Sequence, residues 1–121
     1  MALLMAEAYD SVIDRLGAFN AATEKMAKGK ASRVECSATA PTACRLRLVK
    51  TEEHYAFEVD GDVPPGRDAA LLELHFAPAG AGYRRDIRRA ERSWNVANEM
   101  EDILADVFGL PPDTSVTVVV E

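Results

Sequence analysis

The sequence lacks the features that mark several classes of protein. It has only two cysteines in 121 residues, so it has no disulfide framework of the kind found in small secreted domains. No stretch approaches the roughly 18 apolar residues of a membrane-spanning helix, and the start has no basic segment typical of a secretory signal. We therefore expect a cytoplasmic protein with reduced thiols and without a membrane partner.

An excess of positive charge is also absent. The chain has 20 acidic and 14 basic residues, which gives a formal net charge of −6. Nucleic-acid binding needs a basic surface, so we expect no nucleic-acid partner. No cofactor-binding motif is complete in the sequence, and we expect no cofactor.

The composition is that of an ordinary globular protein, and the length suits a single α+β domain over residues 1–121. A first helix is predicted over Ala2–Ala27, where apolar residues recur at helical spacing and Gly29 supplies a stop. Gly17 inside this helix costs about 1 kcal/mol relative to alanine, which indicates that something approaches the helix closely there.

Alternating apolar and polar residues predict a half-buried antiparallel sheet. The predicted strands are Arg33–Ala38, Ala43–Val49, His54–Asp60, Ala70–Ala77 and Ser115–Val120. A second helix is predicted over Tyr83–Phe108, ended by Gly109. The resulting order is α-β-β-β-β-α-β, which predicts a two-layer sandwich with a mostly antiparallel sheet and two helices on one face.

The predicted second helix is basic in its first half and acidic in its second half. This polarity is opposite to the one that the helix dipole favours, so it suggests a compensating contact. Three interpretations remain open: a solvated charged face, an antiparallel helix–helix homodimer, and an anion site at the helix start. The interaction surface of the dimer would comprise Arg84, Arg85, Arg88, Arg89, Arg92, Val96, Glu99, Met100, Asp102, Ile103, Asp106 and Val107.

The anion site would lie where a glycine turn leads into the second helix. Free N–H groups of a helix start, together with arginines, suit a phosphate or a carboxylate. Its residues would be Gly80, Gly82, Tyr83, Arg84 and Arg85. A second basic group, Arg33, Arg45 and Arg47 on the exposed side of the strands, is diluted by Glu35 and Glu58.

Two histidines and two carboxylates form a weak metal or acid–base candidate. If the third and fourth predicted strands pair with a suitable register, His54 lies opposite His75, near Glu58 and Glu73. A wetted polar sheet face is the simpler interpretation of the same residues.

Cys36 and Cys44 lie symmetrically about a predicted turn, and both belong to the apolar side of their strands. A hairpin that pairs Val34 with Leu46 would place the two cysteines directly opposite each other. We expect two buried, reduced thiols, with a disulfide as the alternative under oxidising conditions.

Two functions follow from these patterns. The first is a cytoplasmic homodimeric interaction or regulatory domain without catalytic activity, joined through the second helix and able to bind a protein partner. The second is a small-molecule-binding or enzymatic domain that uses the cleft between helix and sheet. The predicted order, the small size and the acidity are similar to those of many small α+β proteins, among them bacterial secretion chaperones, which are typically small acidic dimers.

Overall fold

The computed structural model describes residues 5–40, 43–60, 63, 66–88 and 92–121, which form one seven-stranded sheet and three helices. The elements are β1 (Met5–Tyr9), α1 (Val12–Ala27), β2 (Arg33–Ala38), β3 (Cys44–Lys50), β4 (His54–Val59), α2 (Asp68–Glu73), β5 (Ala77–Ala79), β6 (Gly82–Arg88), α3 (Ser93–Asp106) and β7 (Val116–Val120).

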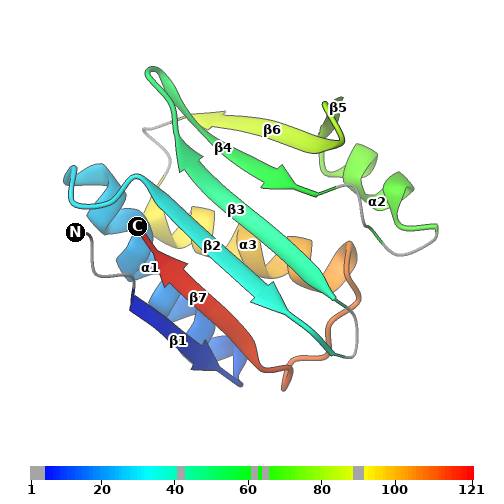
Figure 1. Ribbon diagram of the computed structural model, residues 1–121, viewed down its shortest axis with the longest axis horizontal. Helices are drawn as coiled ribbons and strands as arrows, with labels where there is room; N and C mark the ends of the chain where they lie inside the picture. The colour runs from blue at the N-terminus through cyan, green and yellow to red at the C-terminus, as the bar shows by residue number, and fades with distance from the viewer. Residues whose placement is uncertain (1–4, 41–42, 61–62, 64–65, 89–91) are drawn as a thin grey trace.

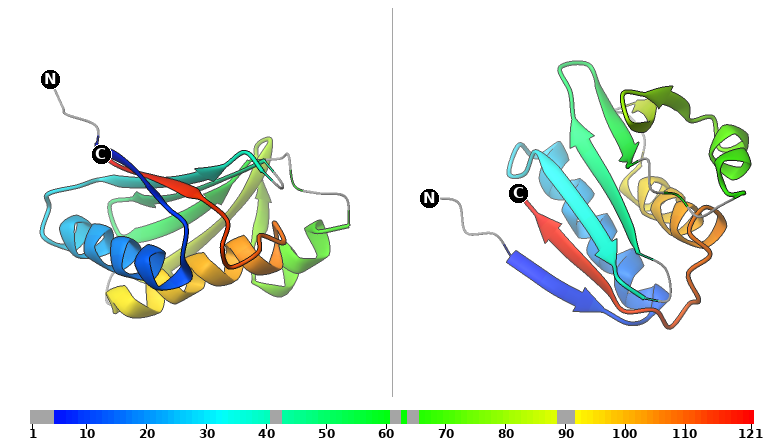
Figure 2. Two further views of the ribbon diagram at one scale, coloured as in Figure 1. Left: turned by 90° about the horizontal axis from the view of Figure 1, so that it is seen from below. Right: turned by 45° about the vertical axis from the view of Figure 1, so that its right-hand side comes forward.

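The strands are arranged in the order β1-β7-β2-β3-β4-β6-β5, and all neighbouring pairs are antiparallel (Figure 1). Helices α1 and α3 lie together against one face of the sheet, and α2 lies beside its β5–β6 end (Figure 2). No described element covers the opposite face, which we call the open face. No helix in the described part of the chain is long and apolar enough to cross a membrane.

The predicted fold class is confirmed. The molecule is an α+β two-layer sandwich with an antiparallel sheet and two principal helices on one face. Seven elements occur in the predicted order: α1, β2, β3, β4, β6, α3 and β7. The structure adds β1, α2 and β5.

The three central strands β2, β3 and β4 form where alternation predicted them. Val34, Cys36, Leu46 and Leu48 are buried beneath the sheet, because successive side chains of a strand point to opposite faces. The predicted register of the first hairpin is wrong by two residues, since Val34 lies opposite Leu48.

The first predicted helix is wrong over Met5–Tyr9, which form an edge strand, and its residues 2–4 lie outside the described part of the chain. Residues Met5–Tyr9 pair with Val116–Val120 of β7, a β-branched strand that offers backbone partners to an extended chain. Helix α1 then begins at Val12, because the side chain of Ser11 accepts a hydrogen bond of 3.2 Å from the Asp14 N–H. The stop at Gly29 is confirmed, with a φ of 74°.

The predicted strand Ala70–Ala77 is wrong, because most of it forms helix α2 and the turn that follows. Leu71 is buried and its neighbour Leu72 is exposed. Such a difference between two consecutive residues occurs in a short helix as well as in a strand. The short run therefore could not distinguish the two structures by its pattern alone.

Helix α2 ends in a Schellman motif that places His75 in the left-handed region, with a φ of 67°. The Phe76 N–H donates to the Leu71 carbonyl at 2.9 Å, and the His75 N–H donates to the Leu72 carbonyl at 3.0 Å. The buried Phe76 ring lies 6.5 Å from the ring of Phe57 on β4, which holds the end of α2 against the sheet.

The predicted second helix is wrong over its first half, which forms strand β6. Tyr83 lies opposite Val59 and Arg88 lies opposite His54, so β6 extends the sheet beyond β4. Its first residue must be glycine, because a Cβ atom on Gly82 would collide with the backbone carbonyl oxygen of Val59. Helix α3 occupies the second half and ends before Gly109, as predicted.

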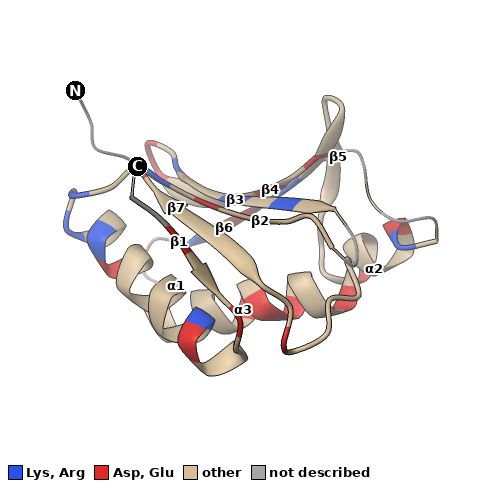
Figure 3. Ribbon diagram, turned by 60° about the horizontal axis from the view of Figure 1, so that its bottom comes forward, with Lys and Arg blue, Asp and Glu red and all other residues tan. Residues whose placement is uncertain are grey.

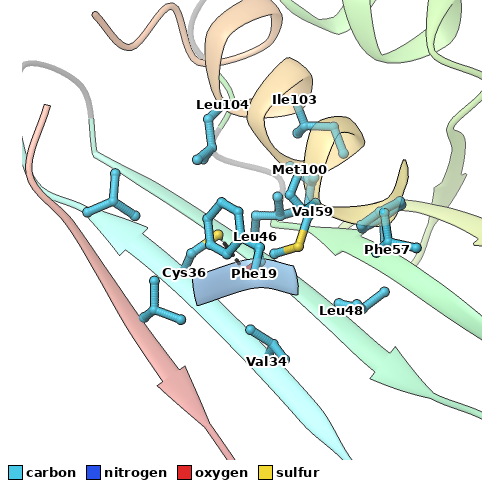
Figure 4. Close-up of a cluster of buried hydrophobic side chains, with 14 of the residues drawn as sticks. Phe19, Val34, Cys36, Leu46, Leu48, Phe57, Val59, Met100, Ile103 and Leu104 are labelled. Atoms are coloured by element: carbon cyan, nitrogen blue, oxygen red, sulfur yellow. Dashed lines mark hydrogen bonds between the residues drawn. The ribbon is translucent and has the colours of Figure 1, made fainter. Parts of the chain in front are cut away.

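The core lies between the sheet and the two principal helices (Figure 4). Phe19 of α1 and Met100 of α3 are fully buried over β2, β3 and β4. The Cys36 thiol also points into this core and donates to the Leu46 carbonyl over 3.6 Å. The apolar faces of both helices are therefore used inside the protomer.

Candidate functional site

The predicted interaction arginines lie on a strand and not on one side of a helix. Arg84, Arg85 and Arg88 belong to β6, and Arg92 immediately precedes α3. Because strand side chains alternate, Arg84 and Arg88 face the open side while Arg85 faces the helices. Arg89 lies outside the described residues.

The acidic second half of the predicted helix is α3, which carries no lysine or arginine (Figure 3). Glu99 forms an ion pair of 3.1 Å with Arg85, so the basic and acidic halves meet inside one protomer. Asp102 and Asp106 are exposed, and the pKa of Asp102 is raised first by the partial loss of water around its carboxylate and next by the neighbouring Asp106 and Glu101.

The apolar residues assigned to the dimer surface do not reach a partner. The structure buries all four of them in the protomer core, at exposures of 0% or 1%: Val96, Met100, Ile103 and Val107. These four side chains are therefore unavailable for the expected helix–helix contact.

The open face carries a row of alternating charges that runs across four strands. Glu35, Arg47, Glu58 and Arg84 lie in turn opposite one another on β2, β3, β4 and β6. Arg47 reaches Glu58 at 3.4 Å and Asp60 at 2.6 Å. Opposite charges on facing positions each stabilise a sheet by about 0.2–1 kcal/mol, so this row supports the sheet while leaving the face close to neutral.

A cavity of about 450 Å³ lies at the end of this row, where β4 meets the β5–β6 turn. It contains Gly82, Tyr83 and Arg84 of the predicted anion site. The prediction of a helix start there is wrong, because these residues open a strand, and Gly80 takes a φ of 59° in the tight β5–β6 turn.

The arginines of this cavity are already paired. A hydrogen bond from Arg47 lowers the pKa of Asp60 and raises that of the Arg47 guanidinium, and Arg84 pairs with Asp86 at 2.9 Å. The cavity therefore offers polar contacts but little uncompensated positive charge for an anion.

The four residues of the metal candidate lie on different elements. His54 and Glu58 belong to β4, whereas Glu73 and His75 lie at the end of α2. The expected pairing of His54 with His75 is wrong, because His54 lies opposite Arg88. Among the residues that the structure describes, no three His, Cys, Asp or Glu side chains are grouped closely enough to hold a metal.

Both cysteines are free and buried. Cys36 lies opposite Leu46 and Cys44 lies opposite Ala38, so the two are not direct cross-strand partners. Burial raises the pKa of the Cys36 thiol well above its ordinary value and also raises that of Cys44, which keeps both in the unreactive thiol form.

A buried ion pair, not foreseen from the sequence, joins both helices to the chain entering β7. Arg15 of α1 bonds Glu101 of α3 through two nitrogen atoms at 2.9 Å each, and it donates to the Thr114 carbonyl at 2.8 Å. The Arg15 side chain is only 3% exposed. The available signal was spacing, because Arg15 lies four residues before the core residue Phe19, on the same side of the helix.

The β1 edge has a groove beneath it, bounded by β1, β7 and α1, with a volume of about 350 Å³. Tyr9 and Val118 line it from the sheet, and Ala18, Ala21 and Lys25 line it from the helix. The groove was missed because the sequence pattern joined β1 and α1 into one helix. The signal against that helix was the sequence Ser11-Val12-Ile13-Asp14, a helix-start pattern placed well inside it.

Comparison with protein-family models, with curated proteins and with solved structures finds no match to this chain.

Proposed function

We propose that this chain is a cytoplasmic, homodimeric interaction or regulatory domain without catalytic activity, of an adaptor-like or chaperone-like kind. The observation that carries the proposal is the open face, a broad sheet surface that no described helix covers. Its charges are paired along rows, and Arg84 and Arg88 lie toward one side of it. A protein partner can bind such a face by forming ion pairs with these side chains in place of the pairs that they form with each other.

The state of the thiols and the positions of the histidines support a non-catalytic role. The two thiols are buried with raised pKa values, and His54 lies opposite Arg88 on the sheet whereas His75 follows α2. Nucleophilic or acid–base chemistry needs such groups within hydrogen-bonding distance of each other.

The homodimer is tested by gel filtration with light scattering over a wide range of protein concentrations. We expect twice the mass of one chain. A monomer at every concentration contradicts the homodimer.

The partner surface is tested by affinity capture from an extract of cells that express this chain. We expect a protein retained by the wild type and lost with the double variant Arg84→Glu, Arg88→Glu, while a matched change on the helix side, Glu24→Lys, retains it. Equal capture by all three proteins contradicts the assignment of the open face.

The second candidate is a small-molecule-binding domain that uses the cavity around Tyr83 and Arg84. The observation that favours it is the arrangement of polar side chains at the end of β4 and β6. A thermal-shift screen against phosphates, nucleotides, acyl-CoA and divalent metals separates the two functions, because a bound ligand raises the unfolding temperature. A reproducible shift that Arg84→Ala abolishes favours the second candidate.

A further inference from the structure

The edge strand β1 is open to another chain along its full length. Its five residues pair with β7 on one side only, and on the other side no described strand is bonded to it. The strand contains neither proline nor lysine, two residues that often protect an edge from pairing, and the carboxylate of its one charged residue, Glu7, accepts a hydrogen bond of 2.7 Å from the Tyr9 hydroxyl. Its backbone therefore presents unpaired donors and acceptors to a further strand.

The flank of α1 below this edge has a symmetrical pattern. Around the midpoint between residues 19 and 20, Asp14 matches Lys25 and Ala18 matches Ala21. Opposite charges therefore stand at the two ends, about 16 Å apart along the helix, with small residues between them. Two such flanks placed antiparallel are complementary in charge, because Asp14 of each meets Lys25 of the other.

Gly17 provides a second sign of an outside contact. A glycine inside a helix is unfavourable, yet no atom of the described chain lies within 4 Å of where its Cβ atom would be. The packing of this protomer does not require a glycine there. A glycine on this exposed side of α1 leaves room for a helix of another molecule to approach closely.

We propose that the homodimer forms by antiparallel pairing of β1 with β1 of a second copy, with the α1 flanks packed against each other below the joined sheet. This inference rests on the proposed function, since it names the surface of the homodimer. A two-fold axis at Ala8 places Glu7 opposite the partner's Tyr9 and avoids facing carboxylates at Glu7. The groove beneath the edge receives the side chains of the added strand that point toward the helices.

The α1 contact supplies area that the strands alone do not provide. A stable dimer usually buries about 800 Å² on each partner, and one five-residue strand accounts for only part of it. Ala18 and Ala21 have small side chains, so α1 of the second copy can approach this flank closely. The opposite charges at the two ends of the flank favour an antiparallel arrangement of the two helices.

The first experiment compares matched substitutions on the two edges of the sheet. Ala8→Lys places two lysines opposite each other at the axis, whereas Ala79→Lys adds the same charge to an exposed position of β5. We expect Ala8→Lys to raise the dimer dissociation constant about tenfold or more, and Ala79→Lys to leave it unchanged. Mass by light scattering measures the dissociation, and urea unfolding confirms that each variant is folded.

The second experiment exchanges the helix charges. Lys25→Asp sets two carboxylates against each other at each end of the helix pair and is expected to weaken the dimer, while Asp14→Lys combined with Lys25→Asp restores it. Such a restoration needs a direct contact between the two positions. A dimer that resists both Ala8→Lys and Lys25→Asp overturns this surface and leaves the homodimer standing. A wild-type monomer overturns both proposals.

Discussion

The two edges of the sheet differ in length, sequence and support. The β5 edge has three residues, includes Pro78, and turns back at Gly80 after one short pairing with β6. The β1 edge has five residues without proline, Glu7 is its only charged residue, and it lies over a helix flank with a groove between them. One edge is closed to further strands by its own sequence, whereas the other is left available.

The arginine contacts that support the two edges also differ, because one is buried and the other is exposed. Arg15, on the β1 side, is buried and bonds Glu101 and the Thr114 carbonyl. Arg67, on the α2 side, is exposed and donates to the Asp106 carbonyl at 3.1 Å. The edge that we propose for assembly is thus the one fixed from within, as a preformed docking surface requires.

The largest effect is expected from removing the buried support. Arg15→Ala leaves Glu101 without its partner in a mostly buried position, so we expect a loss of about 3–5 kcal/mol in the free energy of unfolding. Arg67→Ala, the matched change on the β5 side, should cost less than about 1 kcal/mol, because its hydrogen bond is exposed. Urea unfolding measures both. Equal losses would show that the two edges are supported alike.

The next effect concerns the attachment of the β5 edge. Gly82→Ala brings a Cβ atom against the Val59 carbonyl oxygen, and two paired strands must separate to accommodate it. We expect a loss of about 1–3 kcal/mol, as for other overpacked sites. Gly17→Ala provides a contrast of opposite sign, since its Cβ atom meets no other part of the described chain within 4 Å and alanine is about 1 kcal/mol more favourable than glycine inside a helix. Hydrogen exchange should localise the loosening to β5 and β6, and loosening at β1 instead would contradict this assignment.

A smaller effect of opposite sign is expected at the end of α2. His75 has a left-handed backbone, which costs a residue with a side chain about 1 kcal/mol and costs glycine nothing. His75→Gly should therefore raise the unfolding free energy by up to about 1 kcal/mol. His75→Ala keeps the strain and tests whether the imidazole contributes. A marked loss with glycine would show that the histidine side chain stabilises the β5 side.

The smallest effect is expected in the middle of the open face, between the two edges. Arg47 lowers the pKa of Asp60 in the folded state. The pair therefore stabilises the fold at pH values above the ordinary Asp pKa of about 3.9. This stabilisation is lost as the pH falls through the lowered pKa of Asp60. Because Asp60 is 41% exposed, we expect less than about 1 kcal/mol. The difference in stability between wild type and Asp60→Asn should shrink at low pH and in high salt. A constant difference would exclude the ion pair as its cause.

The sequence predicted those parts of the fold where one face of a strand is buried and the other is wet. In β2, Val34 and Cys36 alternate with charged neighbours, and the period of two leaves no other interpretation. It did not predict β6, because Tyr83-Arg84-Arg85-Asp86 contains good helix formers and the pairing with β4 that overrides them is remote in the chain.

The candidate sites were less predictable, because they depend on which strands become neighbours. The metal or acid–base candidate required the strands of His54 and His75 to pair, but β6 lies beside β4 and His75 follows helix α2. One of the three interpretations of the charged stretch set its basic half against the acidic half of a second chain, whereas Arg85 pairs with Glu99 of the same chain. The sequence pattern showed that these charges are complementary. The arrangement of β6 and α3 in the fold is the reason that they meet within one protomer.

The position of β7 has a consequence for how the molecule is made. The first strand of the sheet bonds only to the last one, since β7 lies between β1 and β2. During synthesis, residues Met5–Tyr9 are made more than a hundred residues before Val116–Val120, so β1 has no strand to pair with until β7 is present. A finished β1 edge needs β7 beside it, so in the homodimer that we propose each copy can pair through β1 only after its β7 has joined the sheet.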